Sequence, residues 1–155
     1  AAGDLLASAR TRRLVGFAGS PDSVGKVLAG EAWIGVAYNG DAVSELDDAT
    51  DFAVPAEGTI IWVDAMTIPA KAPNPDGAHR FINFILGAEV GAQLSNYLAY
   101  ATPNEASLPL IDEEVRGDER VYPTDEAMAR MSVLEVVLEA TTLYDQVWTR
   151  VKAGQ

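Results

Sequence analysis

An aromatic ring and a carboxylate lie two residues apart in the longest β-rich run of the chain. This run is Thr59 to Ile68, and it contains Trp62 and Asp64. Side chains two apart on a strand point to the same face, so the indole and the carboxylate are expected side by side. A ring face attracts a cation by roughly 0.5–2 kcal/mol, and a carboxylate adds a charge-assisted hydrogen bond worth about 1.5–3 kcal/mol. The pair could therefore hold an ammonium group.

Two tyrosines lie at the ends of predicted elements. Tyr38 comes directly before the turn sequence Asn39-Gly40, and Tyr100 comes directly before the break at residues 101–104. Aromatic residues in such places can form the walls of a cleft. The alternative is that Trp62 and Tyr38 are core residues and that Asp64 caps a turn. Spacing alone favours this alternative.

Few residues of the chain could support catalysis. There is no cysteine, and His79 is the single histidine, so neither a Ser-His-Asp triad nor a thiolate or His-rich metal site can be assembled. Glycine-rich phosphate loops of the GxGxxG or GxxxxGK[ST] type are absent. A glycosidase-like carboxylate pair stays open, although no pair stands out by its spacing. The sequence favours a protein that is not an enzyme and that has no cofactor or metal.

Charge and composition narrow the class of partner. The 155 residues suit one compact domain, and 11 basic against 23 acidic residues give a net charge of −12. Such a charge repels phosphate backbones, so a nucleic acid or an anionic membrane is disfavoured. No stretch approaches the 18 consecutive apolar residues of a membrane span. The acidic residues from Asp41 to Asp51 are expected on a solvated helix face rather than around calcium.

Strands and helices are mixed along the chain, which predicts an α/β or α+β fold. The β-branched and aromatic runs predict strands at Leu14–Phe17, Ala32–Tyr38, Phe52–Val54 and Thr59–Ile68.

Capping signals predict where the helices begin and end. A first helix covers about Leu5 to Arg13, and proline-containing caps begin others at Ser20 and Asn74. The helix after Ser20 should end at Gly30, and the helix after Asn74 is interrupted at Gly87.

The C-terminal part is expected to hold the clearest helix. Leu108 to Tyr122 is predicted to be irregular because it is rich in charge and proline. Thr124 then caps a long helix whose Met and aromatic stripe continues to Val151 and is assigned to the core.

Four runs occur in an order that matches a known family. They are GEAWIGVAYNGDA, EGTIIWVDAMTIPAKAPNPDGAHRFINFIL, YATPN and LYDQVWTRVKAG. Together they resemble the C-terminal half of the spermidine/putrescine-binding proteins of bacterial ABC transporters. The similarity covers about Leu14 to Gly154, and its most specific element is a W-x-D-x-x-x-I-P block formed by Trp62, Asp64, Ile68 and Pro69.

The resemblance implies a periplasmic-binding-protein-like fold of the two-lobe type II class, with a mixed sheet and flanking helices. Residues 1–155 would be the C-terminal portion, because family members are about twice as long and their first lobe would precede Ala1. Residues 14–58 would belong to the second lobe, residues 59–70 to a hinge-crossing strand, and residues 71–155 to the closing helices.

The resemblance also assigns binding roles. Trp62 would stack on the methylene chain of a polyamine, and Asp64 would bind one of its nitrogens. Tyr100 would line the cleft, and Tyr38 stands where many members carry tryptophan. Glu135, expected on the last helix, is the polar residue that would reach the cleft from there.

The implied function is that of an extracytoplasmic polyamine-binding component of an ABC importer, with the membrane permease as its partner. It would be periplasmic, or lipid-anchored in a bacterium with a single membrane. The alternatives are a binding protein for another amine, an amino-acid derivative or a sugar, a carboxylate-based hydrolase, and a structural interaction domain. A truncated chain could also self-associate to cover apolar surface.

Overall fold

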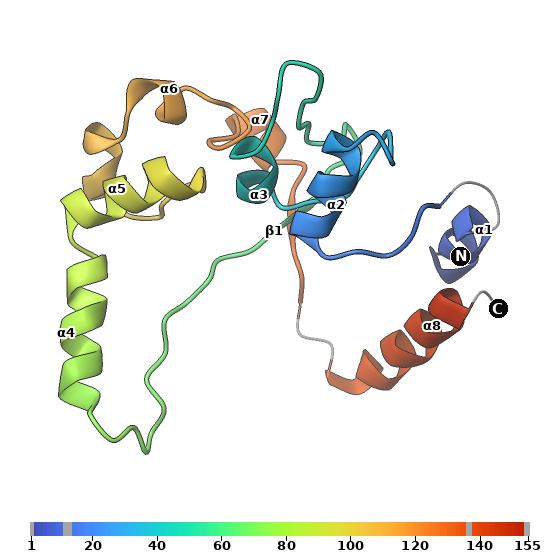
Figure 1. Ribbon diagram of the computed structural model, residues 1–155. Helices are drawn as coiled ribbons and strands as arrows, with labels where there is room; N and C mark the ends of the chain where they lie inside the picture. The colour runs from blue at the N-terminus through green and yellow to red at the C-terminus, as the bar shows by residue number, and fades with distance from the viewer. Residues whose placement is uncertain (1, 11–13, 136–137, 154–155) are drawn as a thin grey trace.

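The computed structural model describes residues 2–10, 14–135 and 138–153 (Figure 1). The α-helices among them are α1 (Ala2–Arg10), α2 (Ser20–Leu28), α3 (Asn39–Val43), α4 (Pro75–Ile85), α5 (Ala88–Leu98), α6 (Glu113–Arg116), α7 (Asp125–Met128) and α8 (Thr141–Ala153). The 3-10 helices are η1 (Glu105–Leu110) and η2 (Leu138–Ala140), and the strands are β1 (Ile60–Ile61) and β2 (Ser132–Val133). No helix within these ranges is long and apolar enough to cross a membrane.

The chain forms an open arch whose two lower ends are α4 and α8 (Figure 1). Its helices pack in separate small groups: α1 lies on α8 from the other end of the chain, α2 lies on α3, and α5 lies on η1. The buried apolar side chains are correspondingly small and scattered over these contacts. They are Val24, Ala42, Ala92, Ile111, Val121 and Val151.

One short parallel ladder joins residues far apart in the sequence. Ile60 pairs with Ser132 and Ile61 with Val133, and the Ser132 amide donates to the Thr59 carbonyl at 3.0 Å. Gly58 precedes the ladder at φ +98°, and the Arg130 carbonyl occupies the space that a Cβ would need. The mixed sheet that the resemblance implied is not found in the described part of the chain, where this ladder is the only one.

Three predicted strands pair with no other strand in the described ranges. Residues 14–17, 32–38 and 52–54 belong to no ladder, and the predicted strand at 59–68 is reduced to β1. β-branched content favours an extended backbone, but a strand also needs a second chain segment to pair its amides and carbonyls. Such a segment is not supplied by the described residues.

The predicted helix starts are largely confirmed. α4 begins at Pro75, and the Asn74 side chain accepts a hydrogen bond from the Gly77 amide at 2.9 Å. α2 also begins as predicted, but Gly19 rather than Ser20 is its N-cap. The Ser20 hydroxyl instead accepts from the Tyr38 amide at 2.8 Å, so it links α2 to the residue before α3.

The long C-terminal helix is wrong as predicted. Thr124 does cap a helix, accepting from the Ala127 amide at 3.2 Å, but α7 ends at Met128. The chain then enters β2, and α8 begins only at Thr141. Pairing with β1 requires an extended backbone at residues 132–133, and this tertiary contact overrides the helical periodicity.

Candidate functional site

Two aromatic rings meet where the chain enters α3 and leaves β1. The centroids of Tyr38 and Trp62 lie 4.7 Å apart with their planes tilted by 54°. Tyr38 is 51% exposed and Trp62 is 43% exposed. These residues are therefore in contact but not buried together, contrary to what the core alternative expects. They present aromatic surface to solvent that a ligand can reach.

Tyr38 is fixed through its backbone and its neighbour. Its amide donates to Ser20, as described above, and the Asn39 side-chain amide donates to the Arg120 carbonyl at 3.0 Å. The first contact comes from α2 and the second from a segment 81 residues later. Both hydrogen bonds fix the start of α3. Two distant parts of the chain therefore position the Tyr38 backbone.

Tyr100 joins the same region from the end of α5. Its hydroxyl donates to Asp41 Oδ1 at 3.0 Å, and its ring occupies the space beside Gly40 that a Cβ would fill. Burial of the phenol, followed by the hydrogen bond to Asp41, raises the pKa of Tyr100 to about 12. The negative charge of Asp41 shifts the Tyr100 pKa in the same direction. Tyr100 is therefore a neutral hydrogen-bond donor at physiological pH.

Asp64 lies in the exposed, extended segment after β1, two residues beyond Trp62. Its carboxylate makes no hydrogen bond and no ion pair with any described residue. Its charge is consequently available to a ligand, as the predicted role requires.

Glu135 differs from the prediction in its element. It is exposed and lies in the extended segment after β2, not on the last helix. Because β1 and β2 are parallel, Trp62 and Glu135 follow the same ends of neighbouring strands. Tyr38, Trp62 and Tyr100 are called the aromatic cluster below. No hydrogen bond or ion pair joins Glu135 to this cluster in the described part of the chain.

Asp41 is the site residue that sequence reasoning missed. We expected it on a solvated helix face extending to Asp51, but the helix ends at Val43. Asp47 instead closes a turn by accepting from Thr50, and Asp51 pairs with an arginine. The signal for Asp41 was its place three residues after Tyr38, about one turn along a helix that begins at Asn39.

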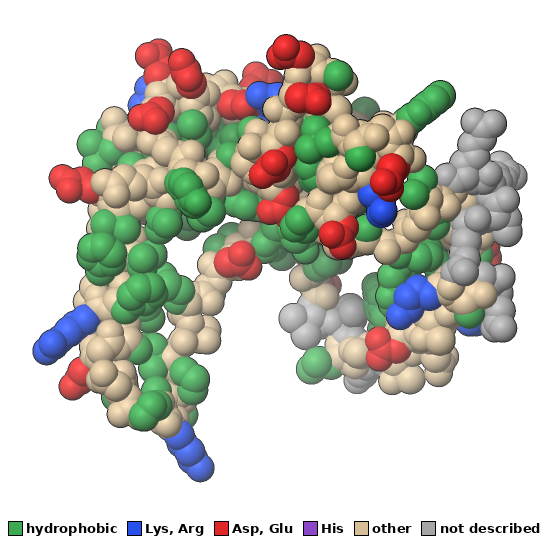
Figure 2. All heavy atoms as spheres, viewed as in Figure 1, with side chains coloured by type: hydrophobic (Ala, Val, Ile, Leu, Met, Phe, Trp, Pro, Cys, Tyr) green, Lys and Arg blue, Asp and Glu red, His purple; other side chains and the backbone are tan. Residues whose placement is uncertain are grey.

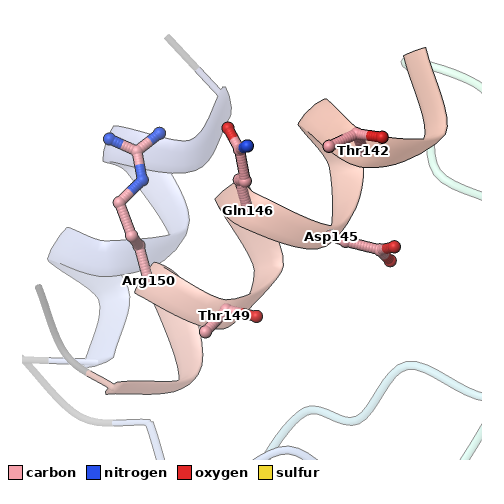
Figure 3. A pocket seen from close by; sticks show the side chains of 5 residues that line it. All are labelled: Thr142, Asp145, Gln146, Thr149 and Arg150. Atoms are coloured by element: carbon pink, nitrogen blue, oxygen red, sulfur yellow. The ribbon is translucent and has the colours of Figure 1, made fainter. Parts of the chain in front are cut away.

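Among the described residues, the other chemistry-bearing groups form no competing site. His79 is an exposed residue of α4. The described residues contain no group of three His, Cys, Asp or Glu that could hold a metal ion. A depression of about 580 Å³ lies along α8 (Figure 3), and neither Tyr38, Trp62 nor Tyr100 lines it. Its lining comes from one helix: Thr142, Asp145, Gln146, Thr149 and Arg150.

Comparison with known proteins gives one family. Residues 7–119 match the family described as bacterial extracellular solute-binding protein. The spermidine/putrescine-binding periplasmic protein of Escherichia coli (strain K12) is 35% identical over 130 residues, which cover 83% of this chain and 37% of that protein. The protein of the same name from Salmonella typhimurium is 33% identical with the same coverage.

A third relative carries a different name. The putrescine/agmatine-binding protein of Pseudomonas aeruginosa is 33% identical over 136 residues, or 85% of this chain and 37% of that protein. The chain thus spans little more than a third of the length of these relatives.

Proposed function

Because this chain belongs to the family of bacterial extracellular solute-binding proteins, we propose that it is part of a protein that binds polyamines outside the cytoplasm for an ABC importer. The relatives' names give the ligand class, and the aromatic cluster gives a physical reason for it. The protein would bind and release its ligand without transforming it.

The observation that carries this proposal is the meeting of two half-exposed rings, Tyr38 and Trp62, beside a tyrosine that is bonded to the carboxylate of Asp41. Tyr38 and Trp62 contact each other, and Asp41 reaches the same region through Tyr100. Flat rings pack well on methylene groups and attract ammonium groups, and each carboxylate can accept a charge-assisted hydrogen bond. Asp64, which has no partner among the described residues, would supply such a bond.

The organisation of the chain follows from the same proposal. Residues 14–58 would belong to the second of two lobes, residues 59–70 would cross the hinge, and residues 71–155 would close the lobe. The extended run that leads from β1 to α4 in Figure 1 is compatible with a connection between lobes. Closure of two lobes around the ligand would be a hinge motion that presents the complex to a membrane permease.

The proposed location is the periplasm, or the outer face of a single membrane with a lipid anchor. An acidic protein suits a cationic ligand there, because its net charge of −12 raises the local concentration of cations.

The test is the substitution Asp64→Asn in the full-length gene product, measured by titration calorimetry with putrescine and spermidine. It removes one charge and leaves the shape unchanged, so we expect about 10- to 100-fold weaker binding, or roughly 1.4–3 kcal/mol. Asp48→Asn is the matched control, because Asp48 is also exposed and lies in a different loop. Equal affinity of the wild type and Asp64→Asn would contradict the role of Asp64.

A thermal-shift panel tests the ligand class itself. Putrescine, spermidine, spermine and agmatine should raise the melting temperature, and neutral sugars should not. A shift by a neutral solute that survives Asp64→Asn would contradict the polyamine proposal and favour a different solute-binding specificity.

A further inference from the structure

A short segment, residues 118–122, contacts both the α3 side of the aromatic cluster, which carries Tyr38 and Asp41, and the backbone around Tyr100. Residues 118–122 contact α3 through the Asn39–Arg120 bond described above and the 47–51 loop through an ion pair of Arg120 with Asp51 at 2.9 Å. Arg120 also pairs with Asp118 at 2.7 Å, which stiffens the segment itself. Val121 is almost completely buried. The segment is thus anchored on the side of the cluster that carries Tyr38 and Asp41.

Tyr122 extends this anchoring to Tyr100. The buried Ser95 hydroxyl donates to the Tyr100 carbonyl at 2.6 Å and lies 2.8 Å from the Tyr122 hydroxyl. Since the single proton of Ser95 is used on Tyr100, Tyr122 must donate to Ser95. The Tyr122 oxygen also accepts from the Thr102 amide at 3.2 Å. The backbone on both sides of residue 101 is therefore held by one phenol and one serine.

The backbone before Tyr100 needs such support. Ala99 has φ +53° and ψ +34°, a left-handed conformation that is unfavourable for a residue with a Cβ. This turn ends α5 and aims Tyr100 toward Asp41 and Gly40. A conformation of this kind persists where surrounding contacts hold it in place.

We propose that Tyr122 is a positioning residue for ligand binding, which acts through Ser95 and Thr102 to hold Tyr100 against α3. This inference rests on the proposed function, because it assigns Tyr100 to the polyamine site. Tyr122 itself is distinct from the three aromatic residues of the cluster, and its hydroxyl is fully used by Ser95 and Thr102.

The first test is the substitution Tyr122→Phe in the full-length gene product. Loss of the hydroxyl removes two hydrogen bonds and keeps the ring, so putrescine should bind about 3- to 10-fold more weakly. The effect should be much smaller in a Tyr100→Phe background, because the two residues act as one unit. Tyr97→Phe is the control, since Tyr97 lies on the same helix and is highly exposed. Additive effects of Tyr122→Phe and Tyr100→Phe would overturn the proposal.

The second test does not depend on ligand binding. With ¹³C at the tyrosine Cζ, the Tyr100 signal can be assigned from Tyr100→Phe and titrated at alkaline pH. If Tyr122 holds Tyr100 on Asp41, Tyr122→Phe and Ser95→Ala should both lower the Tyr100 pKa, and Tyr97→Phe should not. An unchanged Tyr100 pKa in both variants would overturn the proposal. A wild type that binds no polyamine but shows the pKa change would refute the proposed function alone.

Discussion

At the residue scale, Tyr100 links stability to pH in a direction that can be derived. The Tyr100 phenol has a pKa of about 12 in the folded protein against 10.0 for an unperturbed tyrosine. Between these values the unfolded chain has lost a proton that the folded chain still holds, so the free energy of unfolding falls as pH rises. The stabilisation is complete below pH 10 and is lost through the interval up to about 12.

The prediction uses Tyr100→Phe as the reference. At neutral pH the variant should be less stable by about 1 kcal/mol, because a partly exposed hydrogen bond to Asp41 is lost. The difference from the wild type should shrink as the pH rises above 10, which urea unfolding at a series of pH values will measure. Tyr100→Phe leaves every other ionisable side chain in place, so the difference between the two proteins isolates Tyr100. A difference that is constant with pH would contradict this account.

At the element scale, the close approach of α3 and Tyr100 depends on a missing side chain. A Cβ at Gly40 would collide with the Tyr100 ring, whereas a Cβ at Gly25 in α2 meets nothing within 4 Å. Gly40→Ala should therefore destabilise the protein by about 1–3 kcal/mol through overpacking. Gly25→Ala should stabilise it by roughly 0.5–1 kcal/mol, since alanine favours a helix interior.

Thermal or urea unfolding of the two variants provides the measurement. Both variants make the same glycine-to-alanine change, so Gly25→Ala is the control for Gly40→Ala. Their effects on the free energy of unfolding are expected to have opposite signs. Stabilisation by Gly40→Ala similar to that by Gly25→Ala would show that Tyr100 does not pack on α3 as described. Polyamine binding should weaken only in Gly40→Ala, because only this variant displaces Tyr100.

The elements also show how far the sequence could be interpreted. The starts of α2 and α4 were predictable because a proline in the first turn acts locally, and at α4 the Asn74 cap acts locally as well. The break between α7 and α8 was not, because β2 forms only when Ser132 and Val133 meet β1, some 70 residues earlier. The helical periodicity of the sequence depends on neighbouring residues only, so it cannot indicate the pairing of β1 with β2.

In the candidate site, too, residues with a local signal could be predicted and residues joined by long-range contacts could not. Trp62 and Tyr38 were singled out by residue type and position, and the structure places their ring centroids 4.7 Å apart. Asp41 was assigned to a solvated face, because nothing within its own segment indicates the Tyr100 hydroxyl that reaches it from 59 residues away. The ligand-binding roles of all five residues remain predictions: Tyr38, Trp62, Asp64, Tyr100 and Glu135.

At the scale of the whole molecule, the chain exposes much more surface than a compact protein of its size. Its accessible area is 11970 Å² for a mass of 16.5 kDa, whereas a compact monomer of this mass exposes about 7,600 Å². Hydrophobic side chains gather openly over α4 and the segment leading to it (Figure 2). Trp33, Ile34 and Val36 project almost fully into solvent, Trp33 being 92% exposed.

The exposed apolar surface predicts that the 155-residue chain associates with itself when it is produced alone. A segment with apolar residues on both faces is typical of a strand buried inside a parallel sheet. Residues 32–38 should therefore pair with a strand of another molecule when no strand of the same chain covers them. We expect the isolated chain to bind a hydrophobic dye and to gain mass with concentration in sedimentation velocity. Ile34→Lys should reduce this association, and Ala49→Lys, in an exposed loop, should not. A monodisperse monomer that binds no dye would mean that the open surface described here closes in solution.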